Sequence, residues 1–179
     1  MTKVTQIKEE VKIPEGVQLT LEGKTVHVKG QKGSLTKVLS HPKIDLSTRD
    51  NVVLISCSQS PRRKEKALIG TYKALIKTMI KGVTQGYECR MKTVFSHFPI
   101  KTTVEGNTLM ISNFLGERFP RRAEILDSVK VDVKGENLVL TGVDKEKIGQ
   151  TAANIERATK VKNRDIRVFQ DGIYIVKRG

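Results

Sequence analysis

The stretch Leu21-Glu22-Gly23-Lys24-Thr25 recurs 83 residues later as Val104-Glu105-Gly106-Asn107-Thr108. Around the first copy, residues 17–21 and 25–29 alternate apolar and polar side chains, which is the period of a half-buried strand. Two such segments joined by a glycine-bearing turn predict an antiparallel hairpin. Because the turn recurs, we expect this hairpin twice in the chain.

A second pair of segments recurs at a similar distance. Residues 51–55 and 137–141 are apolar and β-branched, lie 86 residues apart, and are each followed by a helical pattern. Gly86-Tyr87 also echoes Gly172-Ile173-Tyr174, so both units are expected to end in a similar way. We therefore predict an α+β fold of two tandem similar domains from a duplication, each an antiparallel sheet packed with one helix.

The predicted N-terminal domain spans residues 1–82 and the C-terminal domain 83–179, with the boundary between Gly82 and Gly86. Residues 1–16 predict an N-terminal arm that ends in a short strand before Pro14. The remaining strand candidates are residues 35–39, 44–46 and 109–111.

The first helix is expected to be capped by Ser60, with Pro61 in its first position and Gly82 as its stop. Its predicted buried face comprises Leu68, Tyr72, Leu75, Ile76, Met79 and Ile80. The opposite face carries a lysine stripe that we interpret as solvated, made of Lys66, Lys73, Lys77 and Lys81. Asp144 predicts the start of the second helix, whose inner face comprises Ile148, Ala152 and Ile155.

The composition favours a polyanionic partner. The 179 residues carry 33 Lys+Arg against 19 Asp+Glu, a net charge of +14. There is no apolar run long enough to span a bilayer and no secretory hydrophobic region at the N-terminus, and the two cysteines form no close pair, so we expect a cytoplasmic protein. Aromatic residues make up only 4%, which favours folded RNA, recognised by its shape and phosphates, over single strands.

Residues 113–122 hold three arginines within five positions, beside Gly116 and Pro120. A rigid arginine-bearing loop is suited to phosphate, because the planar guanidinium makes paired hydrogen bonds. The alternative is a solvated loop whose charges serve solubility. The equivalent loop of the first unit, residues 29–34, is also basic but carries lysines and no proline, a difference that the fold alone does not require.

A second basic cluster follows the second helix, where residues 157–167 contain five basic residues and one acid. The net charge of residues 1–82 is +9 and that of residues 83–179 is +5. The second half is therefore less basic, but its basic residues are more clustered. Clustered charge is what a docking site requires.

The sequence predicts neither an enzyme nor a bound cofactor or metal. Its three histidines are scattered without metal-ligand spacing, its glycines do not form a phosphate loop, and neither cysteine has the local signature of a nucleophile.

The chain resembles the universal ribosomal protein family numbered six in the large subunit. The residues that carry the resemblance cover nearly the whole chain in order, namely 13–17, 26–33, 113–117, 162–167 and 169–174. The motif at residues 113–117 is similar to that of the archaeal and eukaryotic branch, and the length without a long tail indicates the archaeal one.

The resemblance implies a structural constituent of the large ribosomal subunit that binds folded large-subunit ribosomal RNA, chiefly through the second domain. It places the protein near the base of the factor-binding stalk, beside neighbouring ribosomal proteins and close to the translation GTPases, with no membrane or small-molecule substrate. The implied RNA-binding residues are Asn113, Phe114, Leu115, Gly116, Arg118, Arg121, Arg122, Lys160, Lys162, Asn163, Arg164, Arg167, Lys177 and Arg178.

Two alternatives remain open at this point. The first is an RNA-binding chaperone that acts outside the ribosome, which sedimentation with large subunits in high salt would distinguish. The second is a protein of anionic membrane surfaces, which predicts an amphipathic helix with a basic face and a broad, aromatic-rich apolar face.

Overall fold

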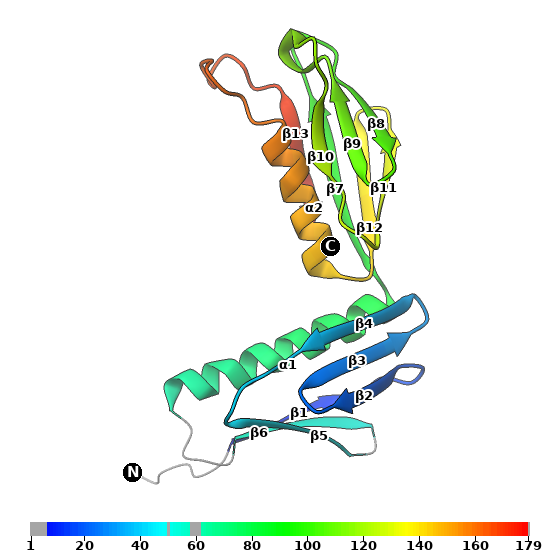
Figure 1. Cartoon of the computed structure of the whole chain (residues 1–179), viewed down its shortest axis with the longest axis vertical. Coiled ribbons are helices and arrows are strands. Elements are labelled where there is room, and N and C mark those ends of the chain that lie inside the picture. Colours follow the sequence, from blue (N-terminus) through cyan, green and yellow to red (C-terminus); the bar gives the residue numbers. More distant parts are fainter. Residues whose placement is uncertain (1–6, 50, 58–61, 179) are drawn as a thin grey trace. The chain divides into compact units, whose positions relative to one another are not determined.

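The computed structural model describes residues 7–49, 51–57 and 62–178. The chain forms two compact units, Met1–Gly86 and Tyr87–Gly179, each with its own strands and one helix (Figure 1). This confirms the α+β class and the duplication. In each unit the strands form two antiparallel sheets rather than one. No helix in the described part of the chain is both long enough and apolar enough to cross a membrane.

The first unit contains two three-stranded sheets and helix α1. One sheet has the order β1-β6-β5 and the other the order β2-β3-β4, and α1 packs against strands of both. The bounds are β1 Ile7–Lys12, β2 Gln18–Glu22, β3 Thr25–Gly30, β4 Gly33–Val38, β5 Ile44–Arg49, β6 Val52–Cys57 and α1 Arg63–Thr84.

The second unit repeats this plan with one additional strand. Its sheets have the orders β10-β9-β8 and β11-β12-β7-β13. The bounds are β7 Tyr87–Val94, β8 Lys101–Glu105, β9 Thr108–Ser112, β10 Arg121–Glu124, β11 Val129–Lys134, β12 Asn137–Gly142, α2 Lys145–Ala158 and β13 Gly172–Arg178, with a short 3-10 turn, η1, at Phe114–Gly116.

The predicted hairpins are present in both units. Strand β2 pairs with β3, and β8 pairs with β9, each antiparallel across a turn with a left-handed glycine, Gly23 at φ 62° and Gly106 at φ 59°. The β5–β6 and β11–β12 pairs also correspond between the units.

Helix α1 differs from its sequence prediction at its C-terminal end. It continues through Gly82 to Thr84, and the division between the units falls after Gly86. Its first residue is Arg63, and the Arg62 amide donates to Glu65 Oε2 at 3.0 Å. The predicted cap, Ser60, and Pro61 lie outside the described residues.

The buried face of α1 is shifted slightly from the predicted one. Tyr72, Ile76, Met79 and Ile80 are buried as expected, but Ile69 replaces Leu68 in the core, and Leu68 and Leu75 are half-buried. The prediction that the lysine stripe is solvated needs a larger correction than the buried face does. Lys66 and Lys77 are exposed, whereas Lys73 is half-buried and its Nζ lies 2.7 Å from Glu9 Oε2 of β1.

Helix α2 begins as predicted, with the Asp144 carboxylate accepting a hydrogen bond from the Glu146 amide at 2.9 Å. Ile148, Ala152 and Ile155 are fully or almost fully buried, in a core shared with both sheets of the unit. The helix contacts β7, β10, β12 and β13 (Figure 1), so it packs against strands of both sheets of the unit.

Strand β7 was not among the predicted strands. Because Gly86-Tyr87 is similar to Gly172-Ile173-Tyr174, the sequence predicted that both segments mark the end of a unit. Instead, Tyr87 begins the second unit, and only Tyr174 lies in the last strand of a unit. The counterpart of β7 in the first unit is β1, since β1 pairs with β6 as β7 pairs with β12. Strand β13 therefore has no counterpart among the described strands of the first unit.

Candidate nucleic-acid interface

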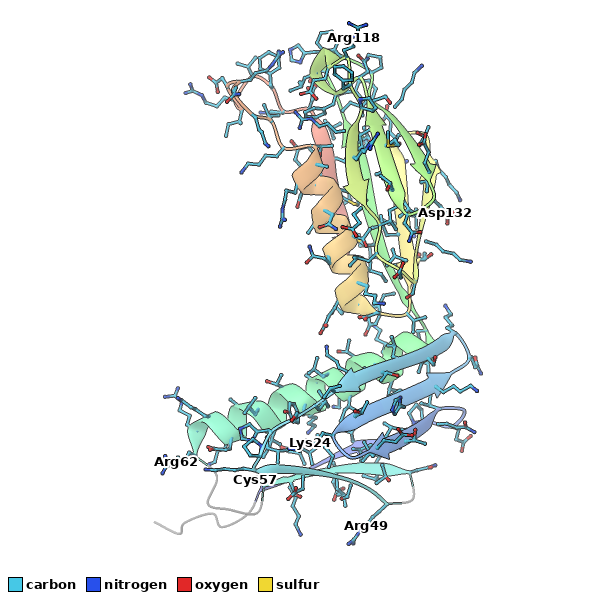
Figure 2. All side chains as sticks on the ribbon, viewed as in Figure 1. Lys24, Arg49, Cys57, Arg62, Arg118 and Asp132 are labelled. Atoms are coloured by element: carbon cyan, nitrogen blue, oxygen red, sulfur yellow. The ribbon has the colours of Figure 1, made fainter. Side chains whose placement is uncertain are left out.

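Three loops meet at one end of the second unit. They are residues 95–100 between β7 and β8, 113–120 between β9 and β10, and 159–171 between α2 and β13. The strand register brings them together, because Lys101 is opposite Ser112, and Gly172 is opposite Val94. We call this region the three-loop end. Figure 2 shows Arg118 at its outer limit.

The backbone of residues 113–116 is tightly constrained. Asn113, Leu115 and Gly116 have left-handed conformations, with φ of 59°, 51° and 76°. A non-glycine residue rarely adopts this region, and a leucine does so at a cost of about 1–2 kcal/mol. Burial of Phe114 and Leu115 holds this conformation in place.

Burial also limits what these residues can do. Phe114 and Leu115 are only 1% and 5% exposed, backbone included, so a ligand on the surface meets the half-buried Asn113 and the exposed Gly116 instead. The Asn113 side chain donates to the Pro99 carbonyl at 3.1 Å and thereby joins this loop to the loop of residues 95–100.

Arg121 connects the arginine-bearing loop to the end of α2. Its Nη1 donates to the carbonyls of Ala158 and Lys160, both at 2.9 Å. Its Nε and Nη2 donate to the two carboxylate oxygens of Glu117 at 2.8 and 2.6 Å, and its guanidinium lies 4.2 Å from the centre of the Phe114 ring. Since four of its five N–H groups are used inside the protein, Arg121 is a structural clamp.

The clamp has an electrostatic consequence for Glu117. The hydrogen bonds from Arg121 hold the pKa of this carboxyl below its ordinary value, and the charges of Arg121 and Arg164 act in the same direction. Burial opposes the shift but is the weaker effect. Glu117 therefore stays ionised and keeps the loop attached to Arg121.

The other two arginines of the 113–122 stretch, Arg118 in the loop and Arg122 in β10, face solvent. Arg118 and Arg122 are exposed, and no residue in the described part of the chain forms an ion pair or hydrogen bond with their side chains. They are thus the two guanidinium groups that the predicted motif leaves free to hold phosphate.

The loop of residues 159–171 is ordered by its own side chains. Asp165 accepts from the Arg167 amide at 2.9 Å and from its guanidinium, with Nη2 at 2.8 Å from Oδ2. Arg167 lowers the Asp165 pKa through these bonds, and Asp165 in turn raises the pKa of Arg167. Asn163 has a left-handed φ of 56° and turns the chain.

An aromatic stack joins this loop to residues 95–100. The Arg164 guanidinium lies 4.8 Å from the centre of the Phe169 ring, and the His97 ring centre also lies 4.8 Å from it. Arg164 is thereby held near the surface, in a range where cation–π attraction is significant.

Buried Asp171 reinforces the same junction. Its Oδ1 accepts from the Ser96 amide at 3.2 Å and lies 3.5 Å from His97 Nδ1, while the side chain is fully buried. The three loops are therefore connected pairwise by Asn113, Arg121 and Asp171, and they form one surface.

The predicted RNA-binding residues are only partly brought together. Lys160 and Lys162 are exposed at the three-loop end with Arg118, Arg122 and Arg164. Lys177 is exposed near the other end of β13, roughly 16 Å along the strand from Gly172. The side chain of Arg178 lies outside the described residues.

Sequence reasoning missed the contribution of residues 95–100, which carry neither arginine nor lysine. A usable signal was present in the distribution of phenylalanine. All five phenylalanines of the chain follow residue 94, at positions 95, 98, 114, 119 and 169, and all lie in these three loops.

Comparison with known proteins agrees with the duplicated architecture. The model of the family "Ribosomal protein L6" matches the chain twice, over residues 13–86 and 98–172. Both β1 and β7 lie outside these two matches, consistent with their equivalent places in the two units.

Curated relatives extend the similarity over nearly the full length. The chain is 48% identical over 178 residues to the large ribosomal subunit protein uL6 of Methanobrevibacter smithii, covering 99% of both chains. It is 45% identical to the proteins of the same name from Methanosarcina mazei, over 98% of this chain and 99% of the relative, and from Methanococcus vannielii, over 96% and 94%.

These matches confirm the resemblance drawn from the sequence motifs, and membership of a ribosomal protein family agrees with the prediction of a protein that is not an enzyme. The chain belongs to the ribosomal protein L6 family.

Proposed function

We propose that this protein is a structural, non-catalytic component of the large ribosomal subunit and binds folded ribosomal RNA through the three-loop end of its second unit. The names of its relatives support the assignment to the large subunit. In this role it acts in the cytoplasm as part of the ribosome and supports translation, with ribosomal RNA and neighbouring ribosomal proteins as its partners.

The observation that carries the RNA-binding proposal is the convergence of unpaired cations on a braced surface. Arg118, Lys160 and Lys162 are exposed on loops that Arg121 holds together, and Arg122 is exposed beside them at the start of β10. Fixed cations match the fixed phosphates of a folded RNA better than mobile ones, because less conformational freedom is lost on binding. Contacts of this kind position the protein on the RNA backbone.

The remaining predicted residues take different roles. Asn113 and Gly116 approach the RNA with their backbone, whereas Phe114 and Leu115 anchor the turn from below. Arg164 offers the RNA a cation whose guanidinium is held against the Phe169 ring. Arg167 is paired with Asp165 and so contributes less net charge. Lys177 and Arg178 belong to a separate contact at the other end of β13.

We place the binding site on the RNA near the base of the factor-binding stalk, close to the translation GTPases. This finer location rests on the family resemblance. Ultraviolet crosslinking within assembled subunits, with the crosslinked RNA positions read out, tests it. Crosslinks confined to RNA remote from the stalk base would refute this location.

The binding surface is tested by two charge-matched variants of the full chain. One carries Arg118→Ala and Arg122→Ala, and the control carries Lys66→Ala and Lys77→Ala on the exposed face of α1. Affinity for large-subunit RNA is measured by filter binding over a series of salt concentrations, and thermal melting verifies the fold of each variant.

We expect the arginine variant to bind more weakly and to flatten the log–log salt dependence by about 0.7–0.9 unit for each phosphate that the protein no longer neutralises. The lysine variant, which removes the same charge, should bind nearly as the wild type does. Equal reductions of affinity in the two folded variants would show that diffuse charge, and not the three-loop end, provides the affinity.

A further inference from the structure

The five phenylalanines of the three-loop end divide into two groups. Phe114 and Phe169 are structural, since one lies under Arg121 and the other is in contact with both His97 and Arg164. The other three face solvent. Phe95 is 36% exposed, Phe98 is 40% exposed and Phe119 is 79% exposed.

Exposure on this scale is unusual for phenylalanine, which prefers the interior and has no polar group to satisfy in water. Phe119 does not gain burial within its own unit, although the Phe114–Leu115 core lies a few residues away in the same loop. Its neighbours are Arg118 and Pro120, so the ring stands between an unpaired cation and a stiff backbone.

The second ring is held in place by backbone geometry. A Cβ atom added at Gly116 would lie 3.3 Å from Phe98 Cζ, so the Phe98 ring lies directly against the backbone of the arginine-bearing loop. The Asn113–Pro99 hydrogen bond fixes one side of the Phe98 loop, and the Ser96–Asp171 hydrogen bond fixes the other. Phe98 is thus presented in an ordered position.

Exposed aromatic rings on the same surface as exposed cations are suited to one kind of ligand. Unpaired nucleotides of folded RNA stack their bases on aromatic rings while the adjoining phosphates contact arginine or lysine. A protein partner with an apolar face fits less well, because Arg118, Arg122 and Lys160 would have to be desolvated without a partner of opposite charge.

We propose that the exposed Phe119 ring is a stacking platform for unpaired bases of the RNA bound at the three-loop end, with Phe98 offering a second ring on the adjoining loop. This inference rests on the proposed function and extends it, since it names the feature that is recognised as a loop or bulge with a base turned outward. Stacking on the ring contributes affinity that does not depend on charge, whereas Arg118 and Arg122 contribute affinity through their charge and therefore through the salt dependence of binding.

The test uses this difference in the full-length protein. Phe119→Ala should weaken binding to large-subunit RNA by about 5-fold to 100-fold, the range that alanine substitution of stacking residues produces. Because the variant keeps every cation that faces phosphate, the salt slope should stay that of the wild type. Phe119→Leu, which keeps apolar area without a ring face, should be nearly as weak as Phe119→Ala.

A spectroscopic variant reports stacking directly, since the chain has no tryptophan. Phe119→Trp should bind as the wild type does, and its fluorescence should be strongly quenched by the RNA. The matched control is Val104→Trp, at a position that is 42% exposed in β8 near the β8–β9 turn, at the end of that hairpin remote from the three loops. Its fluorescence should change little.

Wild-type affinity of Phe119→Ala, full rescue by Phe119→Leu, or an unquenched Phe119→Trp in the RNA complex would each overturn the proposal. Failure of the proposed function is a separate result, because it requires wild-type binding of the Arg118→Ala, Arg122→Ala variant. If Phe119→Ala binds RNA normally but fails to enter large subunits, the ring contacts a neighbouring protein and the stacking proposal is wrong.

Discussion

The β3–β4 turn of the first unit and the β9–β10 loop of the second occupy equivalent places but differ greatly in length. Two residues separate β3 from β4, whereas eight separate β9 from β10. In both units a cation in or directly after this connection nevertheless reaches the end of the helix. Lys32 Nζ donates to the Gln85 carbonyl beyond α1, and Arg121 Nη1 donates to the carbonyls of Ala158 and Lys160 around the end of α2.

The shared contact identifies what the fold requires of this loop. The last carbonyls of a helix have no partner inside the helix and carry partial negative charge, so a cation from the adjacent hairpin stabilises them. The difference identifies what distinguishes the second unit, namely a strained loop that is anchored by the buried Phe114 and Leu115 and carries Arg118 and Phe119 outward.

A second difference concerns the edge of the sheet. In the first unit β1 is an edge strand, and its Lys8, Glu10 and Lys12 side chains are exposed, as is common where unwanted strand pairing must be avoided. In the second unit β13 pairs with the equivalent strand, β7. The segment that leads into β13 is the loop of residues 159–171, so the extra strand and the basic cluster occur together in the second unit.

The comparison is tested most strongly by separating the units after Gly86. Each fragment has its own core and helix, so each should show protected amide protons. Residues 87–179 should bind large-subunit RNA about tenfold or more tightly than residues 1–86, although residues 1–82 carry the larger net charge. Filter binding at moderate salt measures the ratio. Tighter binding by the first fragment would refute the argument from clustered residues, and two disordered fragments would refute the independence of the units.

The two helix-capping cations should differ in their effect on stability. Arg121→Ala leaves Glu117 and two carbonyls without their partner, so we expect a loss of about 2 kcal/mol in the free energy of unfolding. Lys32→Ala removes one exposed contact and should cost about 0.5–1 kcal/mol. Chemical denaturation of each variant measures both values. Equal losses would mean that the clamp in the second unit is no stronger than the simple cap in the first.

A smaller effect is expected from Gly116→Ala, with Gly106→Ala as its matched control. Both glycines have left-handed φ, so both variants should lose about 1 kcal/mol of stability. Only the Cβ at position 116 meets another residue, the ring of Phe98, whereas the space around position 106 is open. Gly116→Ala alone should therefore weaken RNA binding, measured by filter binding at fixed salt. The same reduction in Gly106→Ala would show that strain, and not displacement of Phe98, is responsible.

The smallest effect expected is the pH dependence of the clamp. The pKa of Glu117 is below the ordinary value of 4.5 in the folded protein, so its ionised form stabilises the fold above that pH. This stabilisation decreases as the pH falls through the lowered folded pKa. The stability difference between wild type and Glu117→Gln should therefore be present at pH 7 and disappear in acid, as followed by thermal melting. A difference that persists unchanged at about pH 2, below the usual range of folded carboxyl pKa values, would show that the charge of Glu117 does not matter.

Local patterns predicted much of the architecture. The sequence correctly predicted the hairpins at Gly23 and Gly106, the start of α2 at Asp144 and most of the buried face of α1. These features depend on neighbouring residues and on strand or helix periodicity. Strand β7 was missed although its buried and exposed residues alternate strictly, because the Gly-Tyr echo predicted a domain end at that place.

The candidate site was predicted less completely, and for a physical reason. The three arginines of the 113–122 stretch cannot be told apart in the sequence. In the structure, Arg121 is bound by Glu117 and by carbonyls nearly 40 residues away, whereas Arg118 and Arg122 are exposed. Phe98 has no sequence relation to Gly116, yet it lies against it.

By itself, the sequence determined the duplication, the strand and helix patterns and the excess of positive charge, because these follow from composition and local periodicity. Only the tertiary structure decided which cations are free, which phenylalanines are exposed and which loops form one surface. These properties depend on contacts between segments far apart in the chain, and such contacts exist only once the two sheets and the helix of the second unit have packed together.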